Sequence, residues 1–568
     1  AAAALALRTG AAPRPAPPAA GHALAAIADR AWPGYAELGR DRLNMRPSLT
    51  LGDALGSAAR HAPGDTALVG DGGTLTWAAL AEGVDRVVTT LRALVAADGG
   101  AVEGTHRGAG DGAIEARRTS GAAPRPHAIA LRPDRDDVIV LLAHAVAGIP
   151  LLPLHPALPE VDAARLAAAA GARRLALAQC LQDAPAFART AQASAWPPST
   201  RGPGPDDDLF LVPTSGSSGA PKLARLTHRA VLAAAAALTE RLPFGPRDRW
   251  ILTLPLSHVG GLSVVTRCLS ARRTIVLVPR FVEDAVWTAM VRDGGTRLSA
   301  VPAIAARLLQ ADRSGRLAGL SLMMLGGQAA PLALRRALAD AGVPAVASYG
   351  LTESCAAATC ESPDDAGRPL PGCGTALRGV TVTIAGDDGA ALSAGTPGRI
   401  LLAGPALLAG YAGQPGVEVL DSAGRLDTGD LGWLDDAGRL HVQGRRAEVI
   451  VTGGEKVVPG VVEAALREHA GVRDAVVFGR PDARWGAIVC AAVEGQAALH
   501  DDATLPALLA TLLPPWARPR QMAVFDALPR LNTGKVDRRG TPALALLRLR
   551  PLPASSSPLA RPGRSGPG

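Results

Sequence analysis

The chain has 568 residues, of which 48% are hydrophobic, 19% charged and only 3% aromatic, and its formal net charge is +8. This length suffices for two or three domains of ordinary size. The basic residues are scattered and form no stripe interleaved with aromatic residues, which argues against a nucleic-acid-binding protein; the charge is better suited to anionic small molecules.

Cysteine usage and hydropathy bear on the cellular context. The six cysteines form no C-x-x-C pair and no metal-type spacing with histidine, so we expect free thiols. No run of 18 clean apolar residues occurs, and we therefore expect no membrane span and no stable membrane insertion. We expect a cytoplasmic protein, and the sequence is compatible with a homo-oligomer.

The first half of the chain predicts α/β structure. Residues 1–47 have low complexity and predict a disordered extension, although their acid-poor start also resembles a transit peptide. A helix, a strand–turn–strand and a second helix follow up to about residue 95. Residues 97–126, rich in Gly and Ala, predict a disordered insertion. Beyond them, short apolar runs alternate with Ala-rich helical segments up to about residue 350, which is typical of βαβ units and a largely parallel sheet.

The second half of the chain has a different pattern of predicted elements. After about residue 375 the pattern is one of short strands and Gly-bearing turns, followed by a smaller α+β segment. We therefore predict an α/β fold with a large N-terminal domain over 48–444, containing parallel-rich sheets and a β-rich subdomain. A small, mobile α+β domain over 445–546 and a disordered tail over 547–568 complete the prediction.

A Ser/Gly-rich loop follows the apolar strand LFLVP. Its glycines permit dihedral angles at which successive backbone N–H groups point inward as an anion nest, and its hydroxyls add donors. Lys222 at its end is one of only three lysines among 59 basic residues, and lysine is a compact point charge. A merely flexible loop is the alternative, and the spacing is not that of a Walker A loop, which argues against a P-loop kinase. The predicted phosphate-binding residues are Thr214, Ser215, Gly216, Ser217, Ser218, Gly219 and Lys222.

Three later segments carry further candidate side chains. In YGLTES, Tyr349 offers a flat ring, and the carboxylate of Glu353 suits Mg²⁺ beside a phosphate loop. Asp430 lies in a Gly-flanked turn where its carboxylate can accept both hydroxyls of a ribose, although aspartate is common in turns. Lys535, on a Gly-containing turn near the end of the small domain, can reach into a cleft and bridge two anions.

These segments, in this order over roughly 48–546, resemble the acyl-adenylate-forming superfamily of acyl- and aryl-CoA ligases, peptide-synthetase adenylation domains and luciferases. The phosphate loop departs from the superfamily's pattern at Leu223, where a glycine is usual. The resemblance implies ATP, Mg²⁺ and CoA as cofactor and co-substrates. It also implies roles for Tyr349 against adenine, Thr352 on the α-phosphate and Glu353 on magnesium. ATP would further contact Gly326, Gly327, Gln328, Asp430 and Arg445.

The small domain has implied roles of its own. Lys535 would contact the attacking carboxylate and the α-phosphate together, where its charge offsets their repulsion and stabilises the transition state. Ala447 stands at the hinge, where the family carries Asp, Lys or Ser; a hinge needs backbone freedom more than a given side chain. The loop with Gly453, Gly454 and Lys456 would line the CoA tunnel, although a surface lysine is the alternative for Lys456.

The acid substrate depends on pocket walls rather than motifs. By family position His258 and Gly350 lie on the acyl side, and an inward-facing Arg267 would favour a second carboxylate. An exposed helix arginine is an equally good interpretation of Arg267. The whole region is similar to 2-succinylbenzoate–CoA ligases of menaquinone biosynthesis, so we predict that substrate. A fatty-acid or other aryl-acid CoA ligase and a catalytically impaired nucleotide-binding homologue are the alternatives, the last favoured only by Leu223 and Ala447.

Overall fold

The structure is a computed structural model that describes residues 50–99, 124–182, 202–214, 222–414, 417–531 and 535–552. Residues from Ser48 onward form one compact unit. The predicted extension 1–47 lies outside the described residues, as do most of the predicted insertion and most of the predicted tail.

The largest sheet of the described chain has the strand order β14-β13-β12-β11-β10-β8-β9-β1-β2. Every pairing from β1 to β12 along this order is parallel, as the alternation of apolar runs and helices predicts. Its strands are β1 (Thr66–Gly70), β2 (Gly73–Thr76), β8 (Trp250–Leu252), β9 (Ile275–Leu277), β10 (Arg297–Ala300), β11 (Leu322–Leu325), β12 (Ala345–Tyr349), β13 (Thr359–Cys360) and β14 (Thr375–Ala376). The accompanying helices are α10 (Val259–Ala271), α11 (Glu283–Val291), α12 (Pro302–Ala311) and α13 (Leu332–Asp340).

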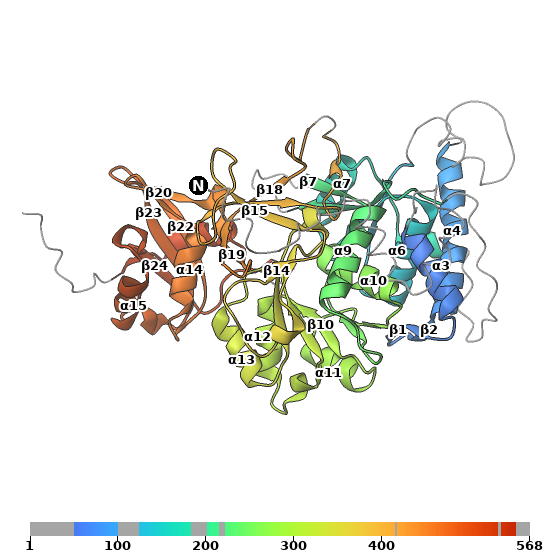
Figure 1. Cartoon of the computed structure of the whole chain (residues 1–568), viewed down its shortest axis with the longest axis horizontal. Helices are drawn as coiled ribbons and strands as arrows, with labels where there is room; N and C mark the ends of the chain where they lie inside the picture. Colours follow the sequence, from blue (N-terminus) through green and yellow to red (C-terminus); the bar gives the residue numbers. More distant parts are fainter. Residues whose placement is uncertain are drawn as a thin grey trace, which may run out of the picture. The chain divides into compact units, whose positions relative to one another are not determined.

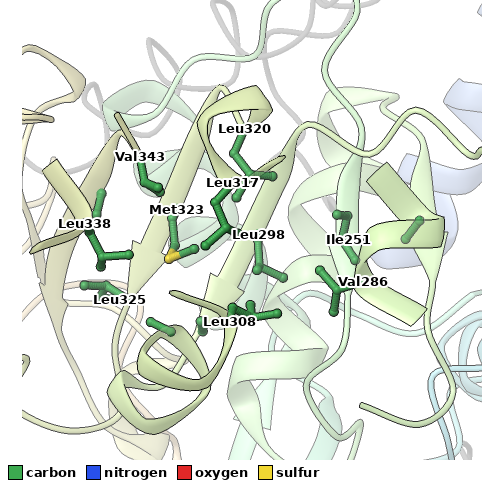
Figure 2. Packing of buried hydrophobic residues seen from close by; sticks show 14 of the residues in the cluster. Ile251, Val286, Leu298, Leu308, Leu317, Leu320, Met323, Leu325, Leu338 and Val343 are labelled. Atoms are coloured by element: carbon green, nitrogen blue, oxygen red, sulfur yellow. The ribbon is translucent and has the colours of Figure 1, made fainter. Parts of the chain in front are cut away.

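An aliphatic core fixes this sheet beneath its helices. Figure 2 shows side chains of β10 and β11 packed in one cluster with side chains of α12 and α13. They include Leu298, Met323 and Leu325 from the strands and Leu308 and Leu338 from the helices. Each of these side chains is buried, and full burial of such a side chain contributes about 1.5–3 kcal/mol. The core therefore holds β10, β11 and β12 in register, and with them the segments that leave their carboxyl ends.

A second sheet has the order β17-β7-β6-β4-β3-β5 within the described ranges. Its strands are β3 (His127–Ala130), β4 (Leu151–Leu154), β5 (Arg173–Arg174), β6 (Asp208–Thr214), β7 (Lys222–Thr227) and β17 (Gly410–Tyr411). The helices of this region are α3 (Leu51–His61), α4 (Trp77–Gly99), α6 (Arg135–Ala147), α7 (Glu160–Ala169), α8 (Leu177–Leu181) and α9 (His228–Arg241). Figure 1 shows α3, α4 and α6 side by side, and α9 beside α10.

Two local predictions for this region need correction, and one pairing was not predicted. The helix after the Ser/Gly loop, α9, begins at His228, but the strand β7 precedes it and pairs antiparallel with β6. The apolar run RLALA predicts a strand, but its last two residues, Leu177 and Ala178, begin α8. The predicted insertion starts too early, because α4 continues to Gly99.

The antiparallel sheet β15-β16-β18-β19 confirms the predicted change of texture after residue 375. Its strands are β15 (Thr381–Ala385), β16 (Gly398–Ala403), β18 (Leu426–Leu434) and β19 (Leu440–Arg445). β18 places Asp430 opposite Arg445 at the end of β19. This pairing brings two of the predicted nucleotide-binding residues together from adjacent strands.

The C-terminal α+β segment has a hydrophobic core of its own, drawn from described residues between 450 and 552. Its elements are β20 (Ile450–Thr452), β21 (Glu455–Val457), α14 (Pro459–Arg467), β22 (Val472–Asp482), β23 (Gly486–Gly495), α15 (Thr504–Leu512), β24 (Gln521–Phe525), α16 (Gly540–Leu546) and β25 (Arg550–Pro551). β25 pairs with β24, so the prediction of a disordered tail from residue 547 was wrong at these residues. No helix among the described residues is long and apolar enough to cross a membrane.

Candidate nucleotide and acyl-transfer site

The site is built on the carboxyl ends of β11 and β12. These strands are parallel neighbours, with Leu325 opposite Ala347, so the segments after them lie together at one edge of the sheet. The Ser348 hydroxyl donates to the Leu325 carbonyl at 2.9 Å, and a Cβ on Gly326 would lie 2.8 Å from the Ser348 Oγ. The predicted adenine-side segment Gly326–Gln328 is thus tied to the strand that ends at Tyr349.

Position 350 requires glycine because the backbone of Ala356 comes very close to it. A Cβ at this position would overlap the carbonyl oxygen of Ala356, because the chain folds back through the 3₁₀ turn Thr352–Ser354. Cys355 and Ala356 have φ angles of 53° and 106°, in the region that favours glycine. The turn packs against β6 and β7, so it brings Thr352 and Glu353 to the strands that flank the Ser/Gly loop.

Tyr349, Asp430 and Arg445 form one polar cluster. The Tyr349 hydroxyl donates to Asp430 Oδ2 at 2.7 Å, and Arg445 Nε pairs with Asp430 Oδ1 at 3.0 Å. Arg445 Nη1 also donates to the Thr428 carbonyl at 2.8 Å. Burial raises the pKa of Asp430, an effect that Arg445 and the Tyr349 hydrogen bond oppose. The Asp430 carboxylate is therefore held in a defined orientation by the Tyr349 hydroxyl at one oxygen and by the Arg445 guanidinium at the other.

Glu353, Tyr411 and Lys222 form a second cluster. The Tyr411 hydroxyl donates to Glu353 Oε1 at 2.9 Å, and Lys222 Nζ lies 5.0 Å from the centre of the Tyr411 ring. Burial and the Glu353 charge raise the pKa of Tyr411, so its hydroxyl stays a donor at neutral pH. Glu353 Oε2 makes no hydrogen bond or ion pair with the part of the chain that the structure describes, which leaves it for a cation.

Lys535 reaches the carboxyl edge of the large sheet. A Cβ placed on Gly327 would lie 3.5 Å from Lys535 Cε and 3.6 Å from its Nζ. Burial, followed by the charges of Lys535 and His155, lowers the pKa of His258 to about 4, so this imidazole is neutral at pH 7. Burial and Arg445 lower the pKa of Lys535 itself. The predicted catalytic lysine is therefore among the predicted ATP-side and acyl-side residues.

Arg267 lies in the interior of the protein. Its exposed fraction is 2%, so the interpretation as an exposed helix arginine is wrong. The guanidinium stacks 4.1 Å above the Trp250 ring, while Nε and Nη2 donate to the Ser263 carbonyl and hydroxyl, each at 2.7 Å. Nη1 of Arg267 donates to Met324 Sδ at 3.5 Å, and no carboxylate of the described residues pairs with this guanidinium. Burial lowers the pKa of Arg267 only to about 10, so it remains charged. A role toward a substrate carboxylate stays a prediction.

The predicted hinge and CoA residues lie outside these clusters. Ala447 is exposed in the 3₁₀ turn Arg446–Glu448. Gly453 and Gly454 form the exposed turn between β20 and β21, and Lys456 is exposed on β21. A Cβ on Gly453 would lie 2.7 Å from the Trp485 ring, over which Arg520 stacks at 4.3 Å.

Part of the predicted phosphate loop lies outside the described residues, namely Ser215, Gly216, Ser217, Ser218 and Gly219. Its two ends are described: Thr214 is buried at the end of β6 and pairs in register with Lys222. Leu223 is buried in the core beneath this hairpin, which accounts for an apolar residue where the family pattern has glycine.

Sequence reasoning assigned no role to Tyr411 or Trp485. Tyr411 is one of three tyrosines in the chain, and its position in a family segment is the one signal that could have marked it. Its hydrogen bond to Glu353 spans 58 residues, which no local pattern reveals. Trp485 is marked only by its position in the Arg-flanked turn RPDARWG.

Comparisons with known proteins identify the family of the chain. The sequence pattern of AMP-binding enzymes matches residues 125–412, and that of the AMP-binding enzyme C-terminal domain matches residues 461–535. The chain belongs to the AMP-binding enzyme family. Its α/β architecture with a small C-terminal domain is that of the family, which confirms the predicted fold class and the resemblance.

Two curated relatives and two solved structures of a third protein are similar to this chain. An indoleacetate–CoA ligase of Aromatoleum aromaticum is 36% identical over 341 residues, which cover 59% of this chain and 66% of the relative, slightly under two thirds of its length. A 2-succinylbenzoate–CoA ligase of Enterococcus faecalis is 31% identical over 57% of this chain and 67% of the relative. The o-succinylbenzoate coenzyme A synthetase of Bacillus subtilis in complex with its acyl-adenylate intermediate has a TM-score of 0.71 at 25% identity, covering 85% of this chain and 96% of that one. Its complex with ATP and magnesium gives a TM-score of 0.70 at 25% identity, covering 86% of this chain and 99% of that one.

Proposed function

We propose that this chain is an ATP-dependent carboxylate–CoA ligase that acts through an acyl-adenylate. In the first step a carboxylate oxygen attacks the α-phosphorus of ATP, and the bond to pyrophosphate breaks. In the second step the thiolate of CoA attacks the acyl carbon, and AMP leaves with the electron pair of the broken C–O bond. The observation that carries the proposal is the position of Lys535 beside Gly327, between the His258 side and the Asp430–Arg445 cluster.

In the first step some residues bind ATP, and Lys535 compensates charge. Asp430 accepts the ribose hydroxyls, Tyr349 lies against the adenine, and Lys222 and Thr352 bind phosphate oxygens. Lys535 stands between the attacking carboxylate and the α-phosphate and offsets their repulsion, which is largest in a site that excludes water. His258, neutral at pH 7, borders the acyl group without adding a charge. In the second step Gly453 and Gly454 line the path of the CoA arm, with Trp485 and Arg520 beside them.

A magnesium ion fits the residues that are present. Mg²⁺ takes one or two carboxylates together with substrate phosphate oxygens. Oε2 of Glu353 makes no hydrogen bond or ion pair with the described residues, so it can serve as such a ligand. No group of three or more ligating side chains occurs in the described ranges, so Glu353 and ATP would hold the ion between them. When bound, Mg²⁺ neutralises phosphate charge.

The acid we propose is 2-succinylbenzoate, consumed in menaquinone biosynthesis. The position of Arg267, buried and without a carboxylate partner in the described chain, supports a dicarboxylate. The relatives act on acids as different as indoleacetate and 2-succinylbenzoate by their names. Another aryl acid or a fatty acid is therefore the rival substrate.

A panel of carboxylates separates these substrates. With ATP, Mg²⁺ and CoA, we expect pyrophosphate release to be fastest with 2-succinylbenzoate, compared with benzoate, indoleacetate, a fatty acid and each of the two monomethyl esters of 2-succinylbenzoate. The two esters are the matched controls: the ester of the reacting carboxylate cannot form an adenylate, and the other ester neutralises only the second carboxylate. Faster release with indoleacetate or a fatty acid would reject the substrate and keep the reaction class. Release with none of the acids would favour the catalytically impaired homologue.

The Tyr349 hydroxyl is expected to position Asp430 for ribose. Tyr349→Phe keeps the ring and removes the 2.7 Å hydrogen bond to a carboxylate. A hydrogen bond to a charged group contributes about 1.5–3 kcal/mol, so we expect the KM for ATP to rise about tenfold or more with little change in kcat. Titration with 2′,3′-dideoxy-ATP provides the control: without ribose hydroxyls, wild type and variant should bind alike. An equal loss with both nucleotides would contradict this role.

A further inference from the structure

The turn that carries Lys535 is closed at its base by backbone contacts. The Leu531 amide donates to the Lys535 carbonyl at 2.8 Å, and the Asp537 amide donates to the Pro529 carbonyl at 2.8 Å. Arg530 and Val536 form an antiparallel bridge between the two arms. The position of the Lys535 side chain therefore depends on what holds these two arms.

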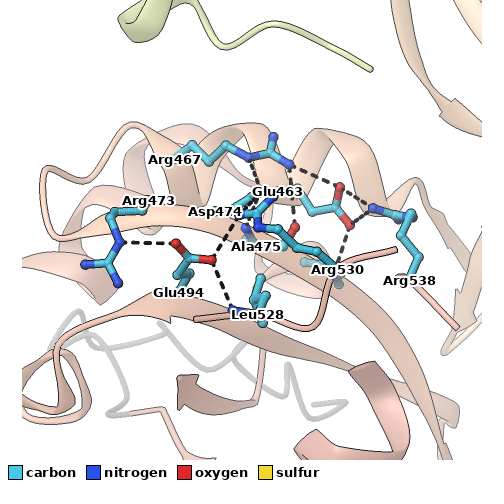
Figure 3. Close-up of polar contacts among 10 residues, drawn as sticks. Glu463, Arg467, Arg473, Asp474, Ala475, Glu494, Leu528, Arg530 and Arg538 are labelled. Carbon is cyan, nitrogen blue, oxygen red and sulfur yellow. Dashed lines mark hydrogen bonds and ion pairs between the residues drawn. The ribbon is translucent and has the colours of Figure 1, made fainter. Parts of the chain in front are cut away.

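Each arm is held by an arginine that reaches carboxylates of the C-terminal α+β segment. On the first arm, Arg530 Nη2 pairs with Glu494 at 3.0 Å and Asp474 at 3.4 Å. On the second arm, Arg538 pairs with Glu463 at 2.8 Å and Glu448 at 2.7 Å. Figure 3 shows these arginines converging on the acidic side chains of α14, β22 and β23.

The Arg538–Glu463 pair is the stronger of the anchors. The Glu463 side chain is only 4% exposed, and its Oε1 also accepts the Val477 amide at 2.9 Å, so its orientation is fixed independently of Arg538. Exposed ion pairs contribute little, whereas removing a partner of a buried carboxylate is costly. Arg467 also pairs with Glu463, at 3.6 Å, so part of the Glu463 charge stays compensated without Arg538. Arg538 is therefore expected to matter more than Arg530 for the position of the turn.

The second partner of Arg538 places this anchor at the predicted hinge. Glu448 directly follows Ala447, and Arg538 holds it through two nitrogen atoms. Arg446, directly before Ala447, pairs instead with Asp427 of β18 at 3.2 Å. Arg446 is thus tied to a carboxylate of the large domain, whereas Glu448 is tied to Arg538 of the lysine-bearing turn. Only Ala447 separates these two anchored residues.

We propose that Arg538 is a positioning residue for Lys535, coupling the lysine-bearing turn to the hinge through Glu448 and Glu463. The turn, Glu448 and α14 then move as one body about Ala447, and Lys535 enters or leaves the ATP side only with that body. The proposal rests on the ligase activity proposed above, because it concerns the first of the two steps.

Arg538→Gln tests the coupling through the two half-reactions. We expect acid-dependent pyrophosphate release to fall roughly 10- to 100-fold, the range typical of supporting residues around a reacting centre. Thioester formation from a synthetic acyl-adenylate and CoA should stay within about twofold, because it does not use Lys535. In a Lys535→Ala background the same substitution should have no further effect, since residues that act as a unit are not additive. Asp502→Asn, which breaks the 3.3 Å pair with His469 elsewhere in this domain, is the matched control and should change neither step.

A second measurement is independent of activity. The chain has only three lysines, so acetic anhydride labelling read by mass spectrometry reports each amine separately. Arg538→Gln should raise the labelling rate of the half-buried Lys535 several-fold, with the exposed Lys456 as internal reference. Unchanged labelling, or equal loss in both half-reactions, overturns the coupling. A wild-type chain that releases no pyrophosphate rejects the ligase proposal, and the labelling result then still decides whether Arg538 holds Lys535 in place.

Discussion

Replacing Lys535 with alanine is expected to slow acyl-adenylate formation by about 100- to 1,000-fold, as is common when one preorganised charge at a reacting centre is lost. The attacking carboxylate and the triphosphate are both anions, and their repulsion grows as water is excluded. A Cβ built on Gly327 would lie 3.6 Å from Lys535 Nζ, and the lysine is close enough to His258 to lower the pKa of that imidazole. The rate of pyrophosphate release with ATP, Mg²⁺ and acid, measured without CoA, isolates this step.

The second half-reaction supplies the control for Lys535→Ala. Thioester formation from a synthetic acyl-adenylate should stay near the wild-type rate, because no anion then has to approach a triphosphate. Lys535→Arg keeps the charge but replaces a compact ammonium by a planar fork, so we expect an intermediate loss. A variant that loses both half-reactions equally, or neither, would show that Lys535 does not act on the first step.

The elements built from local patterns could be predicted from the sequence. Strands β8 to β12 are short apolar runs between amphipathic helices, and burial on both faces leaves such runs little choice of structure. β7 escaped prediction because KLARLT is short, follows a proline and carries two cations, and its pairing with β6 is what makes it a strand. β25 likewise exists through its pairing with β24, although its sequence lies in a polar, proline-rich end.

For the site, residue types could be predicted but contacts between distant segments could not. Asp430, Glu353 and Lys535 are identifiable from motifs, whereas the Tyr411 hydrogen bond and the Arg538 anchor join segments 58 and 90 residues apart. Arg267 shows the same limit. The position of Arg267 on its helix is compatible with either an exposed or a buried side chain. Only its stacking on Trp250, a contact with a distant segment, shows that it is buried.

Glu353→Gln is the second substitution with a large expected effect. It replaces a charged ligand by a neutral one at the only oxygen of this side chain that has no partner in the described structure. We expect kcat/KM for ATP to fall by about 100-fold and the Mg²⁺ concentration for half-maximal rate to rise, because Mg²⁺ depends on carboxylate charge. The measurement is pyrophosphate release over a Mg²⁺ titration at fixed ATP.

Tyr411→Phe separates the metal role of Glu353 from a structural one. The phenyl ring can still pack beside Lys222, but no other residue of the described ranges then holds Glu353 Oε1. Loss of a supporting partner typically costs 10- to 100-fold in metal affinity or activity, so we expect a rise of roughly tenfold in the Mg²⁺ requirement while the KM for the acid stays unchanged. Binding of Mn²⁺ in the presence of a non-hydrolysable ATP analogue, followed by electron paramagnetic resonance, should weaken in the same order: wild type, Tyr411→Phe, Glu353→Gln. If both variants lose activity at an unchanged metal requirement, Glu353 shapes the turn between β12 and β13 and does not hold the ion.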